Sequence, residues 1–126
     1  MSHSNLTYSH LKGEDFKSGG LRDFFEYRDL GIAEASDGRF GAHVIRARPG
    51  HTGGGDKHRH DLGFQMVYVL NGWVRFWYEG TGEVLLQPHS CVYQPPGIPH
   101  RELEHSADLQ LIEITAPARF GTETLD

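Results

Sequence analysis

The chain has 126 residues and a mass of 14.2 kDa, a size that allows one domain and leaves no room for a second. Hydrophobic residues make up 37% of it and charged residues 23%, the usual proportions of a globular protein, which excludes collagen, coiled coil and disorder. The formal net charge is -5, with 12 Lys and Arg against 17 Asp and Glu, so we expect no nucleic-acid partner.

The sequence predicts a cytoplasmic protein that does not span a membrane. Cys91 is the only cysteine, so no disulfide can form within the chain, and residues 1–16 lack the charged and then apolar pattern of a secretory signal. The longest apolar stretch, residues 64–70, is far shorter than the roughly 20 residues that cross a bilayer.

The chain divides into a predicted N-terminal arm, residues 1–20, and a predicted folded domain, residues 21–126. The arm is polar and irregular and ends in Ser-Gly-Gly. From Phe24 onward, short runs rich in aromatic and branched residues alternate with Gly, Pro and Asn turn signals. These runs predict about seven strands, at residues 24–30, 39–48, 64–70, 73–78, 83–86, 91–94 and 109–115.

The clearest turn signal is Asn71-Gly72, because both residues tolerate positive φ and suit a two-residue hairpin turn. We therefore expect the strands at 64–70 and 73–78 to pair antiparallel. Many short strands with small connections predict an all-β fold, either an antiparallel sandwich or a closed barrel whose alternate residues line an interior.

Two histidines separated by one residue, His58 and His60, give the first sign of a binding site. Because strand periodicity is two, both imidazoles would point to one side of a strand and Arg59 to the other. Such a pair supplies two ligands for a metal ion. The pattern fits two solvated histidines in the polar loop of residues 53–61 equally well.

Two later residues occupy positions that suit the same site. Gln65 shares one face of its predicted strand with Val67 and Val69, and a polar side chain buried there needs a partner. A glutamine bonded to the backbone, or one at the rim of the strand, explains that pattern too. His100 follows the stiff segment of residues 95–99, Pro-Pro-Gly-Ile-Pro, which helps to place a ligand accurately.

The spacing of these residues follows two motifs. The first is His58-Arg59-His60, four residues, Gln65, six residues and Gly72. The second is His89, five residues, Pro95-Pro96-Gly97, two residues, His100, three residues and Glu104. Residues 53–104, which hold both motifs, resemble the cupins. That family usually has Glu where Gln65 stands, and Gly and Asn where His89 and Glu104 stand.

The resemblance implies an antiparallel double-stranded β-helix, the jelly-roll barrel of the cupins, over residues 21–126. It further implies that His58, His60 and His100 bind a divalent metal ion, either Fe, Mn, Ni or Zn, with Gln65 at the fourth ligand position. Because a glutamine oxygen brings no charge, the ion keeps its full charge and is a stronger Lewis acid that is held less tightly. Exchanging Gln65 for Glu is expected to tighten metal binding.

The catalytic residues stay unknown, with three candidates. Tyr93 lies in a predicted strand, where an aromatic side chain more often belongs to the core or to a surface between sheets. Glu113 alternates with apolar neighbours, so it faces either inward as an acid or base or outward at a dimer contact. Arg46 would bind an anionic substrate if it faces inward, although an outward salt bridge is the commoner arrangement.

The leading functional hypothesis is a small metal-dependent enzyme, such as a dioxygenase, that acts on a small carbonyl or enol compound held in its barrel. Lyase and isomerase chemistry stay open, since the fold does not select the reaction. The alternatives are a non-catalytic module that binds a small molecule and a metal-free isomerase. Exposed strand edges and the resemblance both predict a homodimer.

Overall fold

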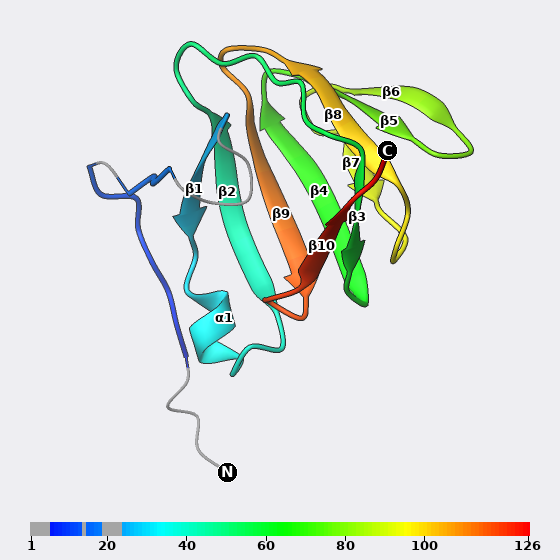
Figure 1. The fold of residues 1–126 in the computed structure, drawn as a ribbon. Helices are drawn as coiled ribbons and strands as arrows, with labels where there is room; N and C mark the ends of the chain where they lie inside the picture. Colours follow the sequence, from blue (N-terminus) through cyan, green and yellow to red (C-terminus); the bar gives the residue numbers. More distant parts are fainter. Residues whose placement is uncertain (1–5, 14, 19–23) are drawn as a thin grey trace.

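The computed structural model describes residues 6–13, 15–18 and 24–126 and folds them into two antiparallel sheets (Figure 1). The first sheet contains, in spatial order, β1 (Phe25–Asp29), β2 (Gly41–Ala47), β9 (Gln110–Ala116), β4 (Phe64–Asn71) and β7 (Cys91–Tyr93). The second contains β10 (Gly121–Thr124), β3 (His58–Asp61), β8 (His100–His105), β5 (Val74–Tyr78) and β6 (Gly82–Leu86). The helix of the described part is α1 (Ile32–Ala35), a single turn.

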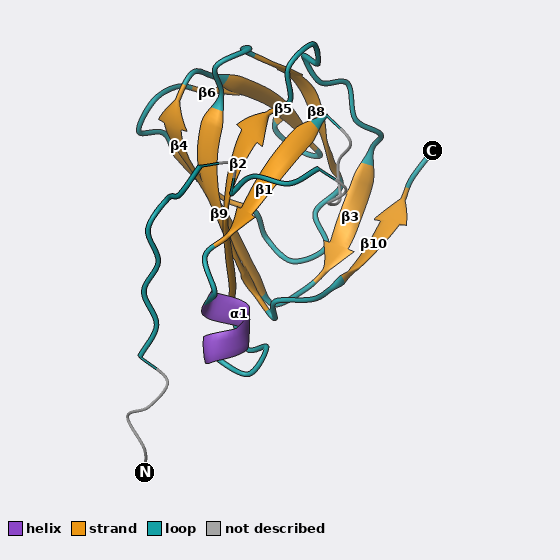
Figure 2. Cartoon of the chain, turned by 90° about the vertical axis from the view of Figure 1, so that its left-hand side faces the viewer, coloured by secondary structure: helices purple, strands orange, loops and turns teal. Residues whose placement is uncertain are grey.

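The two sheets form opposite walls of one barrel. Seen from the side, β3 and β10 stand across from β1, β2 and β9, and α1 lies at the end of β1 (Figure 2). The predicted all-β fold, an antiparallel barrel of the jelly-roll type, is confirmed.

The predicted N-terminal arm is described only in part, since residues 1–5, 14, 19 and 20 lie outside the described residues. Its last described segment bonds to β1: Lys17 N donates to the Tyr27 carbonyl oxygen at 2.9 Å, and Tyr27 N donates to the Lys17 carbonyl oxygen at 2.8 Å. The division after residue 20 falls within the segment 19–23, outside the described residues, and stays a prediction.

Three strands of the second sheet, β3, β8 and β10, lie outside the seven predicted runs. The inward side chains of β3 are His58 and His60, while Arg59 and Asp61 are exposed. Apolar periodicity cannot detect a strand whose inward positions are polar. The seven runs that were predicted correspond to β1, β2, β4, β5, β6, β7 and β9.

The predicted hairpin at Asn71-Gly72 is wrong, because β4 and β5 belong to different sheets. The chain crosses between the two walls at this corner, which packs on the loop between β8 and β9. Asn71 Nδ2 donates to the Asp108 carbonyl oxygen at 2.9 Å. A Cβ added at Gly72, where φ is +70°, would lie 2.9 Å from the Leu109 Cα. Glycine is needed here because two loops approach closely, not because the chain turns into a hairpin.

A β-bulge in β8 changes which of its side chains face the interior. Against β5, Phe76 pairs with Glu102 and Arg75 pairs with Glu104, so Leu103 is the extra residue. The bulge brings His105 to the buried side of the strand, which Glu102 also occupies.

The interior of the barrel has an apolar end and a polar end. Inward side chains along β4 run from Gln65 through Val67 to Val69, which is fully buried. Val74 of β5 and Leu109 pack beside Val69 in the same apolar core. β9 runs antiparallel to β4, so its inward side chains go the other way along the chain, from the apolar Leu111 to the polar Glu113 and Thr115. The polar end is therefore where a binding site can form.

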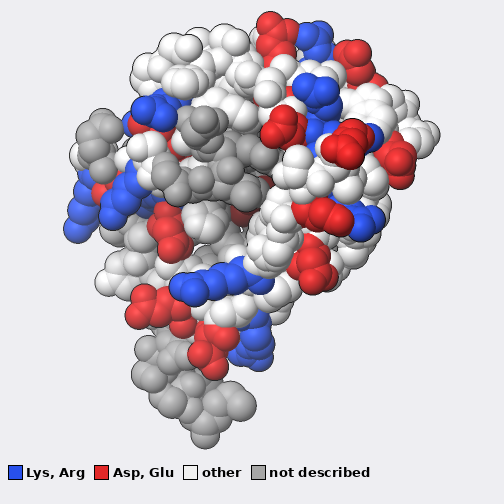
Figure 3. Space-filling view, in the orientation of Figure 1, with Lys and Arg blue, Asp and Glu red and all other residues white. Residues whose placement is uncertain are grey.

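The described surface carries mixed charge. On the face shown in Figure 3, basic side chains alternate with acidic ones and do not gather into one basic patch. That distribution agrees with the expectation of no nucleic-acid partner, which stays a prediction. Within the described residues, no helix is long and apolar enough to cross a membrane.

Candidate metal centre

Three histidines from two neighbouring strands meet at the polar end of the barrel. His58 and His60 lie on β3, and His100 begins β8, which pairs with β3 at His58 and His100. All three are buried, with ring centroids 4.3 to 5.1 Å apart. One nitrogen of each ring lies within 4.8 Å of the other two. This spacing fits three ligands around a single ion.

The Nδ1 atom of each ring forms a hydrogen bond with an oxygen atom. His58 Nδ1 donates to the Asp56 carbonyl oxygen at 2.7 Å, and His100 Nδ1 donates to the Ile98 carbonyl oxygen at 2.9 Å. His60 Nδ1 lies 2.9 Å from Thr122 Oγ1 on β10. Because a carbonyl oxygen only accepts, His58 and His100 carry the Nδ1 proton and keep their lone pair on Nε2. Metal-ligating histidines are oriented in this way, so the donor set fits a divalent metal.

Rigid neighbours hold His100 in place. The preceding turn is closed by Ile98 N, which donates to the Pro95 carbonyl oxygen at 3.1 Å. Tyr78 is the cross-strand neighbour of His100 and stacks on its ring at a centroid distance of 5.8 Å. Burial raises the pKa of the Tyr78 phenol, which is therefore neutral at physiological pH. Its hydroxyl has no hydrogen-bond partner among the described residues, so Tyr78 supports the site through its ring.

Gln65 is buried on the opposite wall and lines the same cavity as the three histidines. Its Nε2 donates to Glu113 Oε2 at 3.0 Å. An ionised carboxylate only accepts, so the amide nitrogen must face Glu113 and Gln65 Oε1 must point away from it. An amide oxygen is a suitable metal ligand but adds no charge.

Two hollows near these residues share part of their lining. The inner cavity has a volume of about 60 Å³ and contains the three histidines, Gln65 and Glu113 in its lining. The outer pocket, about 380 Å³, is lined in part by Arg119 and Phe120, and it shares Tyr27 and Glu113 with the inner cavity. Since one water takes up about 30 Å³ in the liquid, the inner cavity has room for an ion and its waters. The outer pocket has the size of a small-molecule site.

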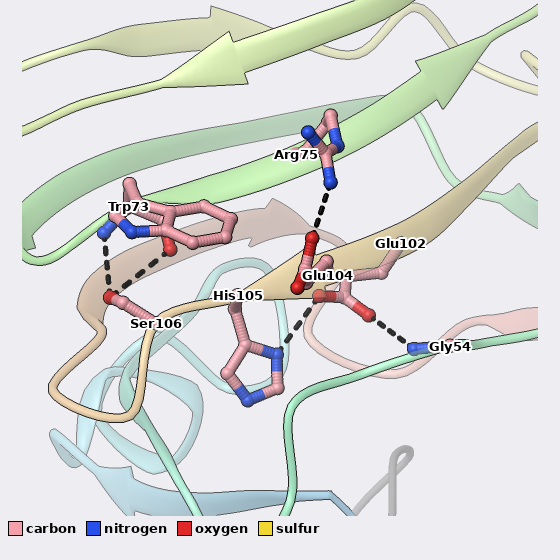
Figure 4. A network of polar contacts seen from close by, with 7 residues as sticks. All are labelled: Gly54, Trp73, Arg75, Glu102, Glu104, His105 and Ser106. Carbon is pink, nitrogen blue, oxygen red and sulfur yellow. Dashed lines mark hydrogen bonds and ion pairs between the residues drawn. The ribbon is translucent and has the colours of Figure 1, made fainter.

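A buried pair on β8 fixes the loop that leads into β3 (Figure 4). Glu102 accepts hydrogen bonds from His105 Nδ1 at 2.9 Å and from Gly54 N at 2.9 Å. A Cβ at Gly53, where φ is +108°, would lie 2.2 Å from a Glu102 carboxylate oxygen, so glycine is needed for this contact. His105 Nε2 is buried with no partner among the described residues. We call Glu102, His105 and Gly54 the β8 clamp.

The structure places two of the three catalytic candidates away from the cavity. Tyr93 is 55% exposed on β7, beside Phe64, because Val92 takes the inward position of this short strand. Arg46 lies on the face of β2 opposite to Ile45 and forms an ion pair with Glu26 at 2.9 Å. The outward salt bridge of Arg46 is the arrangement expected to be the commoner one, whereas the exposed Tyr93 does not belong to the core. Of the three, Glu113 is the candidate in the cavity.

Sequence reasoning missed Gln94, Glu102 and His105. Gln94 is buried in the lining of the inner cavity, and its Oε1 has no hydrogen-bond donor among the described residues. Glu102 could have been found, since it lies two residues from His100 on a strand. His105 could not, because the bulge that turns it inward has no signal in the sequence.

The cupin-domain family model matches residues 43–115, more than half of the chain. This chain is a cupin. The match spans His58, His60, Gln65 and His100 and confirms the resemblance seen in the two motifs. No curated protein is similar enough in sequence to match the chain.

Solved structures of other proteins share the fold. The polyketide cyclase RemF from Streptomyces resistomycificus has a TM-score of 0.72 and 18% identity, with 95% of this chain and 87% of that chain covered. A sugar phosphate isomerase of the cupin superfamily from Silicibacter pomeroyi has a TM-score of 0.67 and 19% identity, with 88% and 76% covered. A salicylate 1,2-dioxygenase from Pseudaminobacter salicylatoxidans has a TM-score of 0.63 and 12% identity, with 82% and 31% covered.

These similar structures include an isomerase, a cyclase and a dioxygenase, and a decarboxylase and a lyase also match. At such low identity the comparison shows the fold alone. The reaction has to be argued from the residues of this cupin.

Proposed function

We propose that this cupin is a metal-dependent enzyme in which His58, His60 and His100 hold a divalent ion and Gln65 Oε1 is a fourth ligand. The observation that carries the proposal is the oxygen partner of each Nδ1, together with ligand nitrogens that lie within 4.8 Å of one another. Three imidazoles and one amide oxygen suit Fe, Mn, Ni or Zn. When bound, the ion polarises a carbonyl or enolate oxygen and, if it is Fe, supports oxygenation.

The inner cavity and the outer pocket differ in volume, and this difference suggests which of them holds the metal and which holds the substrate. The inner cavity of about 60 Å³ is too small for an organic molecule beside an ion, whereas the outer pocket of about 380 Å³ can take one. Tyr27 and Glu113 line both spaces, so a substrate in the outer pocket would reach the ion past these side chains. Phe120 packs against His60 in an edge-to-face contact with ring centroids 5.1 Å apart.

We infer a small uncharged substrate with a hydroxyl group, as an enol or a hydroxylated carbonyl compound has. Gln94 Oε1 is a buried acceptor, and leaving it without a donor is costly, so a substrate hydroxyl or a water is expected to donate to it. No Lys or Arg is among the described residues that line the inner cavity, and Arg119 is the cation of the outer pocket. This charge pattern gives little support for a phosphate group deep in the barrel.

The first test is the metal content of protein purified without chelator. We expect about one equivalent of Fe, Mn, Ni or Zn, lost in His100→Ala and retained in the matched control His51→Ala, whose histidine is exposed in a loop. Bound Fe leads to a second measurement, in which O2 consumption is followed with small diketones and enols. Protein that holds no metal and takes none up on incubation contradicts the proposal. That result favours a non-catalytic binding module or a metal-free isomerase.

We also propose a homodimer formed through the outer face of the first sheet. Met66 and Ile114 are cross-strand partners on this face, as are Tyr68 and Ile112, and all four are only partly buried. A two-fold axis would bring these apolar rows together in one isologous interface. Sedimentation should give a dimer for the wild type and a monomer for Ile112→Lys; a monomeric wild type contradicts this proposal. The expected cytoplasmic location stays a prediction.

A further inference from the structure

The bond between Gln65 and Glu113 explains how the site can use a neutral fourth ligand. We propose that Glu113 is a positioning residue: it keeps Gln65 Oε1 directed at the metal and supplies, from outside the coordination sphere, the negative charge that Gln65 lacks. This inference rests on the proposed metal site, which it deepens.

The register of the first sheet builds the pair. On β9, Thr115 is the direct cross-strand partner of Gln65, and Glu113 is the partner of Val67. Glu113 is therefore the diagonal neighbour of Gln65 on the inward face, a distance that long side chains can bridge. They do so through the hydrogen bond of 3.0 Å from Gln65 Nε2 to Glu113 Oε2. The contact is set by strand pairing inside the barrel and not by a flexible surface.

Orientation is the first consequence of this bond. An amide group can rotate to present either its oxygen or its nitrogen to the ion, and the NH2 end has no lone pair to offer a metal. A carboxylate beside the amide removes this ambiguity, because it can accept only from the nitrogen. Glu113 thus selects the orientation in which Gln65 is a ligand.

Charge is the second consequence. With three neutral imidazoles and a neutral amide, a divalent ion would keep its full charge in a buried cavity, which is unfavourable. The Glu113 carboxylate lies one hydrogen bond beyond Gln65 and offsets part of that charge. It also polarises the Gln65 amide and increases the electron density on Oε1. The oxygen thereby becomes a stronger metal ligand, an effect that acidic partners of metal ligands generally have.

The experiment compares metal dissociation constants by competition with a chromophoric chelator, using Zn and Co. Glu113→Gln keeps the shape of the side chain and removes its charge, and we expect binding weaker by about 10- to 100-fold, the usual effect of losing such a partner. The absorption spectrum of the Co-bound protein should shift as well, because Gln65 Oε1 is no longer held toward the ion and polarised by a carboxylate. The matched control is Glu83→Gln, which removes an exposed glutamate of β6 and should change affinity by less than about twofold.

A charge exchange separates positioning from a merely structural role. Gln65→Glu alone places two carboxylates about 3 Å apart, so their repulsion should limit the expected gain in affinity. The double variant Gln65→Glu with Glu113→Gln moves the charge into the ligand position and restores the amide–carboxylate hydrogen bond. We expect it to bind metal at least as tightly as the wild type. A carboxylate ligand tightens metal binding by itself, so the deciding comparison is with Gln65→Glu alone. The double variant should bind metal more tightly than Gln65→Glu, in which the two carboxylates repel each other, and equal affinities would indicate a merely structural role.

The outcomes distinguish this inference from the proposed function. Wild type that binds no metal defeats the proposed function itself. Wild type that binds metal, with Glu113→Gln within about twofold of it, leaves the metal site intact and overturns the inference. If Glu113→Gln keeps the metal affinity of the wild type but loses turnover, Glu113 contacts the substrate instead. Should Glu113→Gln fail to fold, as judged by thermal unfolding of the metal-free protein, the comparison of Gln65→Glu with the double variant still decides the question.

Discussion

The two ends of the barrel interior are built by the same strands but present different chemistry. At the apolar end, Val69, Val74 and Leu109 are at most 1% exposed and pack into one cluster from both sheets. At the polar end, β4 presents Gln65 and β8 presents His100, side chains that are buried nearly as completely. The two ends therefore differ in the polarity of their buried side chains and not in the extent of burial.

This difference indicates a division of work. Removing apolar surface from water stabilises the fold, whereas burying imidazole, amide and carboxylate groups costs free energy unless partners compensate. The polar end meets this cost with specific hydrogen bonds, such as those from His58 Nδ1 and Gln65 Nε2. We expect changes at the apolar end to alter stability and changes at the polar end to alter ligand binding.

The largest expected effect on stability comes from Leu109→Ala. Leu109 is 1% exposed at the centre of the apolar end, so the substitution leaves a cavity and should lower the free energy of unfolding by about 2 to 5 kcal/mol. Urea unfolding measures this change, with the exposed Leu85→Ala as the control, which should stay within about 0.5 kcal/mol. Metal affinity of the folded variant should match the wild type. A large loss of affinity would mean that the two ends are coupled.

A smaller effect is expected from Glu102→Gln, in the β8 clamp that lies between the two ends. An amide can accept the bond from Gly54 N or from His105 Nδ1 through its oxygen, but its NH2 group cannot accept the other. Losing one charge-assisted bond in a buried site should cost about 1.5 to 3 kcal/mol of unfolding free energy.

The matched control for the clamp is Glu104→Gln on the same strand. Glu104 faces solvent and pairs with Arg75, as Figure 4 shows, and an exposed pair contributes at most about 1 kcal/mol. If both variants lose the same free energy of unfolding, burial does not make the bonds of Glu102 stronger than those of the exposed Glu104. A loss confined to Glu102→Gln would tie the loop before β3 to the stability of the fold.

The same division explains how much of the molecule could be predicted from its sequence. The strands of the first sheet and β5 and β6 were found, because most of their inward residues are apolar. β3, β8 and β10 were not found as apolar runs, and the Asn71-Gly72 corner was mistaken for a hairpin. Local turn chemistry cannot tell a hairpin from a crossing between sheets, which tertiary packing on Asp108 and Leu109 decides.

The candidate site was predictable where spacing carries information. His58, His60, Gln65 and His100 follow from strand periodicity and the cupin motifs, and the structure brings all four into one cavity. The partner of Gln65 did not follow, because Glu113 is 48 residues away and only the strand register brings the two together. Contacts between distant strands are set by register, which a single sequence does not reveal.

The smallest expected effect comes from Tyr78→Phe, which tests the border between the two ends. The Tyr78 hydroxyl is buried with no partner among the described residues, so removing it should raise the free energy of unfolding at pH 7 by about 1 kcal/mol. The stacking on His100 depends on the ring and should persist, leaving metal affinity unchanged. The exposed Tyr93→Phe is the control and should have no effect.

The alkaline pH dependence of the metal-free protein checks the same group. Burial raises the pKa of the Tyr78 phenol, so the folded state favours the protonated form. The stabilisation from this preference is complete below the ordinary phenol pKa of about 10 and is lost as the pH rises above it. Urea unfolding at pH 7 to 11 should show this loss in the wild type and a smaller one in Tyr78→Phe. A destabilised Tyr78→Phe at pH 7 would instead mean that the hydroxyl has a partner in solution, because deleting a bonded group costs free energy whereas deleting an unbonded one does not.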